Sequence, residues 1–249
     1  MTAQEPWYER EDFWEWTAPF MFGEERFERA ASSVGELTAF LRLASPAPVL
    51  DLCAGPGRFA VPLAAAGYSV TAVDRSRAFL ATLTARARGR SLDIETVCCD
   101  MREFRREGAF EAVLNMYTSF GYFEDPEDDR RVLENVFSSL RPGGRLVMEL
   151  HGRESLIRAF RRRDWEEAHG ITIIEERSFV DHFTRLHNRW IVLRGSERRE
   201  FEFDLRIYGA SELCALLRSV GFASAEAYAD FQGAPYDIAA GRLVALAAK

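Results

Sequence analysis

Three aspartates at the ends of predicted strands are the first residues in this sequence whose spacing suggests chemistry. Asp51 lies just before the glycine-rich stretch 55–57, and Asp74 and Asp100 end the next two strand-like runs. In open α/β folds the carboxyl ends of the strands share one edge of the sheet, and ligands bind there. The sequence therefore predicts three carboxylates around one ligand.

The glycine-rich stretch has two interpretations. Residues 55–60 fit the G-x-G-x-x-G/A pattern of dinucleotide-binding loops, although a tight strand-to-helix turn without a ligand would also explain the glycines. A pyrophosphate would meet the like charge of Asp51 in a poorly screened cleft. Asp51 and Asp100 therefore disfavour a nicotinamide enzyme. They favour S-adenosylmethionine, which carries an amino group and a sulfonium.

Alternating strand and helix patterns position these acids. Strand-like runs cover residues 47–52, 68–74, 93–100, 110–116 and 145–150, and helical patterns lie between most of them. This alternation predicts a parallel sheet with helices on both faces. Three serines, Ser33, Ser76 and Ser211, precede apolar helical stripes and are predicted helix N-caps.

The alternation is interrupted after the fifth strand. Residues 171–180, 186–195 and 199–209 form three strand-like runs without a helix between them, which predicts an antiparallel insertion. We expect an N-terminal aromatic lid and helix at 1–46 and a core at 47–151 and 209–249. The insertion, at 152–208, is predicted to cap the substrate, although dimerisation through its strand edges remains an alternative.

Five segments together resemble the class I S-adenosylmethionine-dependent methyltransferases, and the flanks resemble a bacterial small-molecule subgroup. The segments are VLDLCAGPGRFAVPLA, VTAVDRS, CCDMREF, FEAVLNMYTSFGYF and LRPGGRLVMEL. The resemblance implies a Rossmann-like α/β fold with a seven-stranded, mostly parallel sheet. One departure is Cys53, where the family usually has glycine.

The resemblance also implies which residues bind the cofactor, S-adenosyl-L-methionine, and its product S-adenosyl-L-homocysteine. Asp51 would hold the methionine end together with the backbone of the glycine turn, Asp74 the ribose hydroxyls, and Asp100 the adenine. The complete predicted set is Asp51, Ala54, Gly55, Gly57, Asp74, Arg75, Asp100, Met101, Asn115 and Met116.

The residues of the methyl acceptor site are less constrained by chemistry. Transfer from a sulfonium requires alignment in a shielded site, and a general base only when the acceptor arrives protonated. His151, near the end of the fifth strand, and Tyr117 are the candidate catalytic residues. Four aromatic residues are candidates for lining the substrate site or acting as a lid: Tyr8, Phe13, Trp14 and Tyr122.

Composition limits the partners. A formal net charge of −7 over 249 residues disfavours nucleic acid, no apolar run approaches the ~20 residues that span a bilayer, and the four cysteines lack metal-ligand spacing. We expect a cytoplasmic monomer or homodimer without a metal, methylating a nitrogen, oxygen or carbon of a small molecule. The alternatives are a non-catalytic module that binds the cofactor, or a protein or RNA methyltransferase.

Overall fold

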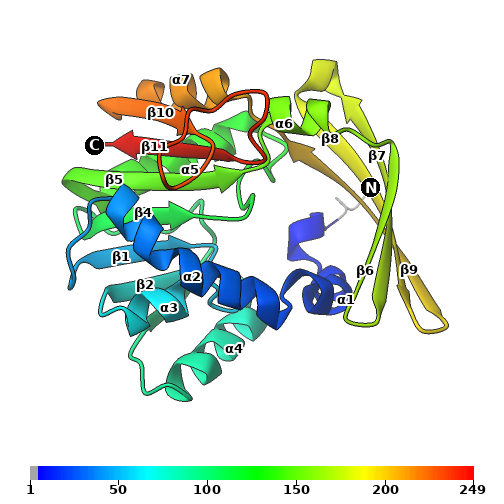
Figure 1. Ribbon diagram of the computed structural model, residues 1–249, viewed down its shortest axis with the longest axis horizontal. Helices are drawn as coiled ribbons and strands as arrows, with labels where there is room; N and C mark the ends of the chain where they lie inside the picture. The colour runs from blue at the N-terminus through cyan, green and yellow to red at the C-terminus, as the bar shows by residue number, and fades with distance from the viewer. Residues whose placement is uncertain (1–4) are drawn as a thin grey trace.

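The computed structural model describes residues 5–249, so the first four residues of the predicted N-terminal lid lie outside it. Seven strands form the main sheet (Figure 1). In spatial order they are β10 (Ser224–Tyr228), β11 (Leu243–Ala248), β5 (Leu140–Leu150), β4 (Phe110–Asn115), β1 (Pro48–Leu52), β2 (Ser69–Asp74) and β3 (Glu95–Cys98). Among residues 5–249, the antiparallel pairs of this sheet are β10–β11 and β11–β5, and its other pairs are parallel, which confirms the predicted mostly parallel sheet.

Helices cover both faces of this sheet because each carries one apolar stripe. On one face, α5 (Pro126–Ser139) and α7 (Ala210–Val220) bury residues such as Val132 and Leu213. On the other, α2 (Glu24–Phe40), α3 (Ala60–Ala65) and α4 (Arg77–Arg88) bury residues such as Leu37 and Leu83. The central strands are therefore apolar on both sides, as expected for a covered parallel sheet.

Of the three predicted N-caps, only Ser76 is confirmed: its hydroxyl accepts a hydrogen bond from Phe79 N at 3.3 Å. Ser33 lies in the middle of α2, where its hydroxyl donates to the carbonyl of Ala30. Ser211 lies in the first turn of α7, which begins after Gly209. Both of these predictions were wrong because a favourable local motif did not mark the point where the helix starts.

A second, antiparallel sheet follows β5 and a short helix, α6 (Arg153–Arg158), as predicted. It has four strands, whereas the sequence indicated three: β6 (Arg163–Ala168), β7 (Ile171–Val180), β8 (Arg185–Arg194) and β9 (Glu197–Arg206). A short 3-10 turn, η2 (Asp181–Phe183), joins β7 to β8. The additional strand β6 is mostly polar, so it lacked the apolar alternation by which the others were recognised.

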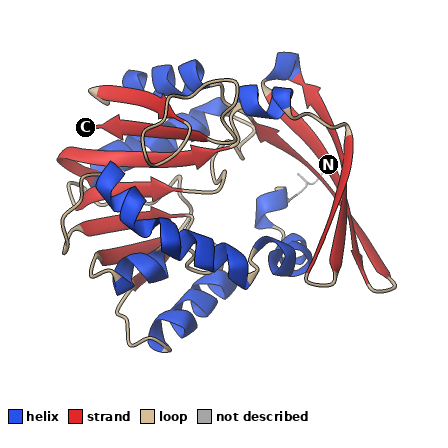
Figure 2. Cartoon of the chain, viewed as in Figure 1, coloured by secondary structure: helices blue, strands red, loops and turns tan. Residues whose placement is uncertain are grey.

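The N-terminal aromatic residues form helices that pack on this second sheet. They comprise a 3-10 turn, η1 (Trp7–Glu9), and a helix, α1 (Glu11–Met21). Phe13, Trp16 and Phe20 of α1 share an apolar cluster with Ile173 and Phe201 of the sheet. Figures 1 and 2 show α1 and η1 between the two sheets, next to the carboxyl edge of the main sheet.

Within residues 5–249, no helix is both long and apolar enough to cross a membrane.

Candidate functional site

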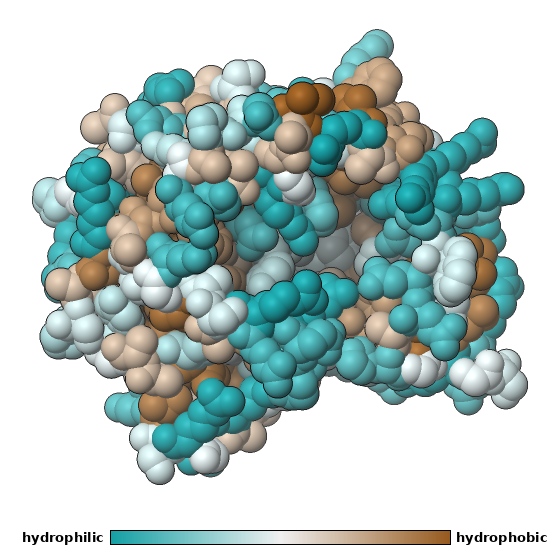
Figure 3. Space-filling view, in the orientation of Figure 1, coloured by the Kyte–Doolittle hydropathy of each residue, from teal (hydrophilic) through white to brown (hydrophobic). Residues whose placement is uncertain are grey.

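A cavity of about 310 Å³ lies at the carboxyl edge of the main sheet, between this edge and the second sheet. Figure 3 shows the molecular surface hollowed near its centre, in the region between the two sheets. The loops that follow β1, β2, β3 and β4 form one wall of the cavity. The opposite wall is largely aromatic and comes from the N-terminal helices and the second sheet, through Trp7, Phe13, Trp14, Trp190 and Phe203.

Asp51 provides a test of whether the predicted cofactor fits this cavity. Its side chain is 3% exposed, and its Oδ2 has no hydrogen-bond partner among residues 5–249. Burial, with a further contribution from the charge of Asp74, raises the pKa of Asp51 to about 7. A buried carboxylate oxygen without a partner is costly, and a cationic ligand group would relieve that cost. The amino group of S-adenosylmethionine has the required charge.

Asp74 connects the end of β2 to the glycine turn. Its two oxygens accept hydrogen bonds from Gly55 N and Ser76 N, each at 2.8 Å. Burial raises the pKa of Asp74, although these two bonds oppose the shift by stabilising the carboxylate. Each carboxylate oxygen can accept more than one hydrogen bond, so Asp74 retains capacity for a ligand hydroxyl.

Asp100, unlike Asp51 and Asp74, forms an ion pair with an arginine, Arg102. Arg102 donates to both of its oxygens, through Nη2 at 2.8 Å and Nε at 3.0 Å. Burial acts to raise the pKa of Asp100, but the bonds from Arg102 outweigh it and lower the pKa. Asp100 is thus an ionised acceptor held in a fixed orientation. Beside it, the Sδ of Met101 lies 3.5 Å from the Sγ of Cys53.

Two loops at the cavity contain non-glycine residues in the left-handed backbone region. Cys53 has φ 65°, and after β4 Tyr117 and Thr118 have φ 55° and 60°. Cys53 therefore adopts the conformation for which glycine is suited at that position, at a cost in strain. Such strain is typical of functional loops, where it directs backbone groups towards a ligand.

Eight of the ten predicted cofactor residues line the cavity, and two do not. The eight are Asp51, Ala54, Gly55, Asp74, Arg75, Asp100, Met101 and Met116. Gly57 has φ 91°, and a Cβ there would lie 2.7 Å from Leu83 Cγ, so this glycine allows the turn to pack on α4. Asn115 is buried, its Nδ2 donates to Ser119 O at 3.1 Å, and its Oδ1 has no partner in the part of the chain that the structure describes.

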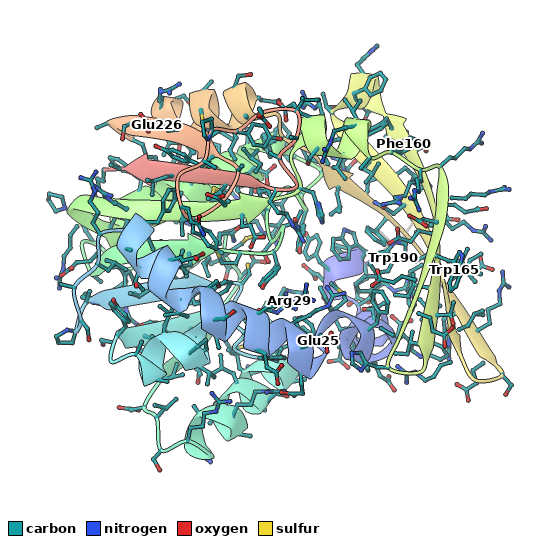
Figure 4. The ribbon with its side chains drawn as sticks, in the orientation of Figure 1. Glu25, Arg29, Phe160, Trp165, Trp190 and Glu226 are labelled. Carbon is teal, nitrogen blue, oxygen red and sulfur yellow. The ribbon has the colours of Figure 1, made fainter. Side chains whose placement is uncertain are left out.

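All six predicted acceptor-site residues line the cavity: Tyr8, Phe13, Trp14, Tyr117, Tyr122 and His151. Trp190, Phe203 and Leu205 of the second sheet line it too, although sequence reasoning did not name them individually. Figure 4 shows Trp190 on the side of the second sheet that faces the cavity. Their strand alternation was visible in the sequence, but which face would be turned inward was not.

His151 is less available as a base than its position in the sequence suggested. Its Nε2 lies 2.8 Å from Arg242 Nη1, which can only donate, so the lone pair of this nitrogen is occupied. Desolvation by the cavity wall, followed by repulsion from Arg242, lowers the pKa of His151 to about 3. In this arrangement His151 is a neutral ring at the cavity wall.

Three arginines also line the cavity without having been predicted: Arg26, Arg58 and Arg242. Arg58 follows the glycine turn directly and could have been noticed there. Arg26 and Arg242 are far from the motifs in sequence, and only the fold brings them to the cavity. Among residues 5–249, no group of three or more His, Cys, Asp or Glu side chains could hold a metal ion.

Comparisons with known proteins, by sequence and by structure, both find methyltransferases. Residues 49–144 match the protein family described as "Methyltransferase domain". A glycine/sarcosine N-methyltransferase from Halorhodospira halochloris is 29% identical over 111 residues, which are 44% of this chain and 41% of that protein. The chain thus spans less than half the length of the first curated relatives it matches, 41% and 42%.

Solved structures extend the similarity to the whole fold. The CcbJ methyltransferase from Streptomyces caelestis has a TM-score of 0.73 at 23% identity, covering 85% of this chain and 87% of that chain. The sugar N-methyltransferase KedS8 from Streptoalloteichus sp ATCC 53650 has a TM-score of 0.64 at 20% identity, covering 92% and 90%.

Proposed function

We propose that this chain, a member of the class I S-adenosylmethionine-dependent methyltransferases, transfers a methyl group to a nitrogen atom of a small molecule. The observation that carries this proposal is the construction of the cavity. Acids at the carboxyl edge of the main sheet form one wall, and aromatic side chains of the N-terminal helices and the second sheet form the other. Such a site suits a cationic cofactor against one wall and a small acceptor against the other.

The cofactor side of the cavity has a defined division of roles in this proposal. S-adenosylmethionine would supply a methyl group on a sulfonium, which an acceptor takes by in-line displacement. The unpartnered oxygen of Asp51 would accept from the amino group, Asp74 would hold the ribose, and Asp100 with Met101 would contact the adenine. All these groups are positioned before the cofactor binds, so binding requires little reorganisation.

The acceptor side supports a small substrate. Trp190, Phe203 and Leu205 line the cavity opposite the cofactor edge, so a small acceptor would lie against a largely apolar wall. The aromatic wall would also exclude water from the sulfonium and stabilise its charge by cation–π contact. Relatives named N-methyltransferases appear in both the sequence and the structure comparison, beside two named O-methyltransferases, and we propose nitrogen as the reacting atom on the strength of the former.

His151 and Tyr117 remain the proposed residues closest to the reacting atoms. Arg242 occupies the Nε2 lone pair of His151, so His151 can act as a base only if this contact is released. An amine that arrives neutral needs no base, and His151 would then orient the acceptor. The backbone strain at Tyr117 fixes the direction of that loop beside the cavity.

The test is turnover with methyl-labelled S-adenosylmethionine and a panel of small amines, alcohols and carbon acids. We expect labelled product from amines and matching formation of S-adenosylhomocysteine. Asp51→Asn should bind the cofactor more weakly than the wild-type protein. Asp93→Asn, at an exposed position that does not line the cavity, is the matched control and should retain activity.

Three experimental results would contradict the proposal. Transfer only to protein or RNA fractions would favour a macromolecular substrate, despite the acidic charge. Tight binding of the cofactor with no transfer to any fraction would favour a non-catalytic binding module. Absence of cofactor binding by the folded protein would reject the methyltransferase activity altogether.

A further inference from the structure

The polar side chains that line the cavity differ between the two ends of the main sheet. The acids lie at or just after the ends of β1, β2 and β3, and no further Asp or Glu of residues 5–249 lines the cavity. In Figure 1 the arrows of β4 and β5 point towards the second sheet, and β11 starts at the same edge. Three other polar residues line the cavity there: Thr118 after β4, His151 after β5 and Arg242 before β11. We call these three residues the donor patch.

Arg242 is incompletely paired. Its Nη1 lies 2.8 Å from His151 Nε2, and its Nε lies 3.6 Å from Glu149 Oε1, an ion pair without a hydrogen bond. Within residues 5–249, its Nε and Nη2 form no hydrogen bond. A guanidinium carries five N–H groups, so most of those of Arg242 are available to a ligand.

The contact with Arg242 also decides what His151 can offer. A guanidinium can only donate, so Nε2 of His151 accepts and the ring hydrogen is on Nδ1. Desolvation, together with repulsion from Arg242 and Arg177, lowers the pKa of His151, so the ring is neutral. In the described part of the chain Nδ1 has no hydrogen-bond partner. His151 therefore presents one N–H donor and no free lone pair.

Thr118 is the third donor. Its Oγ1 accepts a hydrogen bond of 3.0 Å from the backbone N–H of His151, and its hydroxyl hydrogen has no acceptor among the described residues. The backbone N–H of Thr118 donates to Glu149 O at 2.9 Å. These two bonds join the loop after β4 to the end of β5. The donors are thus held in place relative to one another before a ligand binds.

We propose that the donor patch binds an oxyanion, a carboxylate or a phosphate, carried by the methyl acceptor. This inference rests on the proposed function and names the class of acceptor. An oxyanion has the negative charge and the several lone pairs that one guanidinium, one imidazole N–H and one hydroxyl would satisfy together. The acceptor would be a small amine with an anionic group at its other end, lying beside the wall of Trp190 and Phe203.

The carboxylate of the cofactor could also reach a donor at this edge. The acceptor is favoured because the donor patch lies at β5 and β11, whereas the acids assigned to the cofactor lie at β1, β2 and β3. The two sources differ in a measurable way. Only an acceptor contact lets Arg242 change the selectivity among acceptors while leaving the affinity for S-adenosylhomocysteine unchanged.

The first experiment compares three amines that differ at the end remote from nitrogen: propylamine, β-alanine and O-phosphoethanolamine. Turnover is measured at about pH 8, where a histidine is neutral even at its ordinary pKa. In the wild-type protein we expect kcat/KM to be at least about tenfold higher for one of the two anionic amines than for propylamine. The preferred anionic amine distinguishes carboxylate from phosphate.

Arg242→Met should abolish this preference. We expect kcat/KM for the preferred anionic amine to fall by roughly 10- to 100-fold, mainly through KM, and that for propylamine to fall far less. Arg242→Lys, which keeps the charge without the fork, should show an intermediate loss. Arg145→Met is the matched control, because Arg145 is a partly buried arginine of β5 that does not line the cavity.

The second experiment needs no turnover. The protein is saturated with S-adenosylhomocysteine and titrated with sodium acetate or inorganic phosphate, while the ring resonances of His151 are followed. Their assignment comes from their loss in His151→Gln. We expect a saturable shift with a midpoint of roughly 1–10 mM for one of the anions. Arg242→Met and Thr118→Val, which keeps the branched shape without the hydroxyl, should raise the midpoint, and Arg145→Met should not.

The outcomes separate this inference from the proposed function. Equal losses for anionic and neutral amines in Arg242→Met would show that Arg242 only supports the wall, and would overturn the oxyanion site. Weaker binding of S-adenosylhomocysteine with an unchanged preference among amines would assign the donor patch to the cofactor. No saturable shift with either anion would also reject the site. Absence of turnover with every amine would reject the proposed function, and the anion titration would still decide whether the site exists.

Discussion

The carboxylate of Asp74 accepts a hydrogen bond of 2.8 Å from the backbone N–H of Gly55, so the end of β2 holds the glycine turn that follows β1. The same carboxylate also accepts from Ser76 N. A residue proposed to bind the ribose is therefore also part of the framework of the site. Substitutions here should affect binding and stability together.

For Asp74→Asn, we expect the affinity for S-adenosylhomocysteine to fall at least about tenfold, because charge-assisted bonds contribute ~1.5–3 kcal/mol each. The free energy of unfolding should also fall by about 1–3 kcal/mol, since an amide NH₂ would face a backbone N–H that needs an acceptor. Calorimetry and chemical denaturation check the two effects. Asp93→Asn, at an exposed position, should change neither; loss of affinity without loss of stability would show that the framework role is wrong.

Asp51 should couple cofactor binding to proton release. Its pKa in the free protein is raised to about 7, and an ammonium group beside it would lower that pKa again. Below pH 7 binding should therefore release a proton, and affinity should rise from about pH 5 to about pH 7. Titration in two buffers of different ionisation enthalpy measures the released proton. Asp51→Asn should show no release, and a wild-type protein without it would place the amino group elsewhere.

The same raised pKa has a consequence for the folded protein without ligand. In the unfolded chain the pKa of an aspartate is about 3.9, so the native state holds this proton over a range where the unfolded state has lost it. The contribution of Asp51 to stability should decrease as the pH rises from about 4 to 7. Burial also raises the pKa of Asp129, to about 6, so Asp129 changes the stability with pH in the same direction. Replacing Asp51 by Asn should flatten this part of the stability profile.

Arg242 should control the protonation of His151. In Arg242→Met the ring loses both the donor at its Nε2 and the repulsion from the guanidinium, so its pKa should rise from about 3 towards the ordinary value. The ring-proton resonance of His151, assigned by its loss in His151→Gln, reports the change during a pH titration. An unchanged pKa would mean that desolvation alone sets it.

Cys53 should tolerate glycine better than valine. At φ 65° glycine is free of the steric cost, whereas a β-branched side chain is strongly disfavoured. We expect Cys53→Val to be about 2 kcal/mol less stable than Cys53→Gly in chemical denaturation. Cys98→Val, on strand β3, is the control and should have little effect. Equal stability of the two Cys53 variants would show that the turn relaxes without strain.

Phe13 tests whether α1 is a loosely attached lid or part of a core. It is 1% exposed and packs with Phe201 of the second sheet at a ring-centroid distance of 5.3 Å. Phe13→Ala should therefore cost about 3–5 kcal/mol of stability, as for other buried phenylalanines. Phe183→Ala, where the side chain is 53% exposed, should cost far less. A small effect at Phe13 would identify α1 as a flap that opens independently.

The sequence by itself determined the main sheet and the meeting of three acids at its carboxyl edge. The five alternating strand and helix patterns predicted the parallel sheet, and the positions of Asp51, Asp74 and Asp100 within them placed three acids at one edge. These predictions succeeded because strand ends and turn glycines are local features, and a parallel sheet brings its carboxyl ends together by construction. The capping motif at Ser33 predicted a helix start that the structure does not have. The helix begins further upstream, and α2 continues through Ser33.

Only the tertiary structure decided what closes the site. The packing of Phe13 against Phe201 and the stacking of Arg58 on Tyr117 join segments far apart in the chain. The identity of a buried group's partner depends on such long-range contacts, which no residue pattern within one segment encodes. For the same reason the sequence could not show that Arg242 Nη1 contacts His151 Nε2, or that no carboxylate of residues 5–249 forms an ion pair with Arg58. Both depend on how separate helices, strands and loops pack against one another.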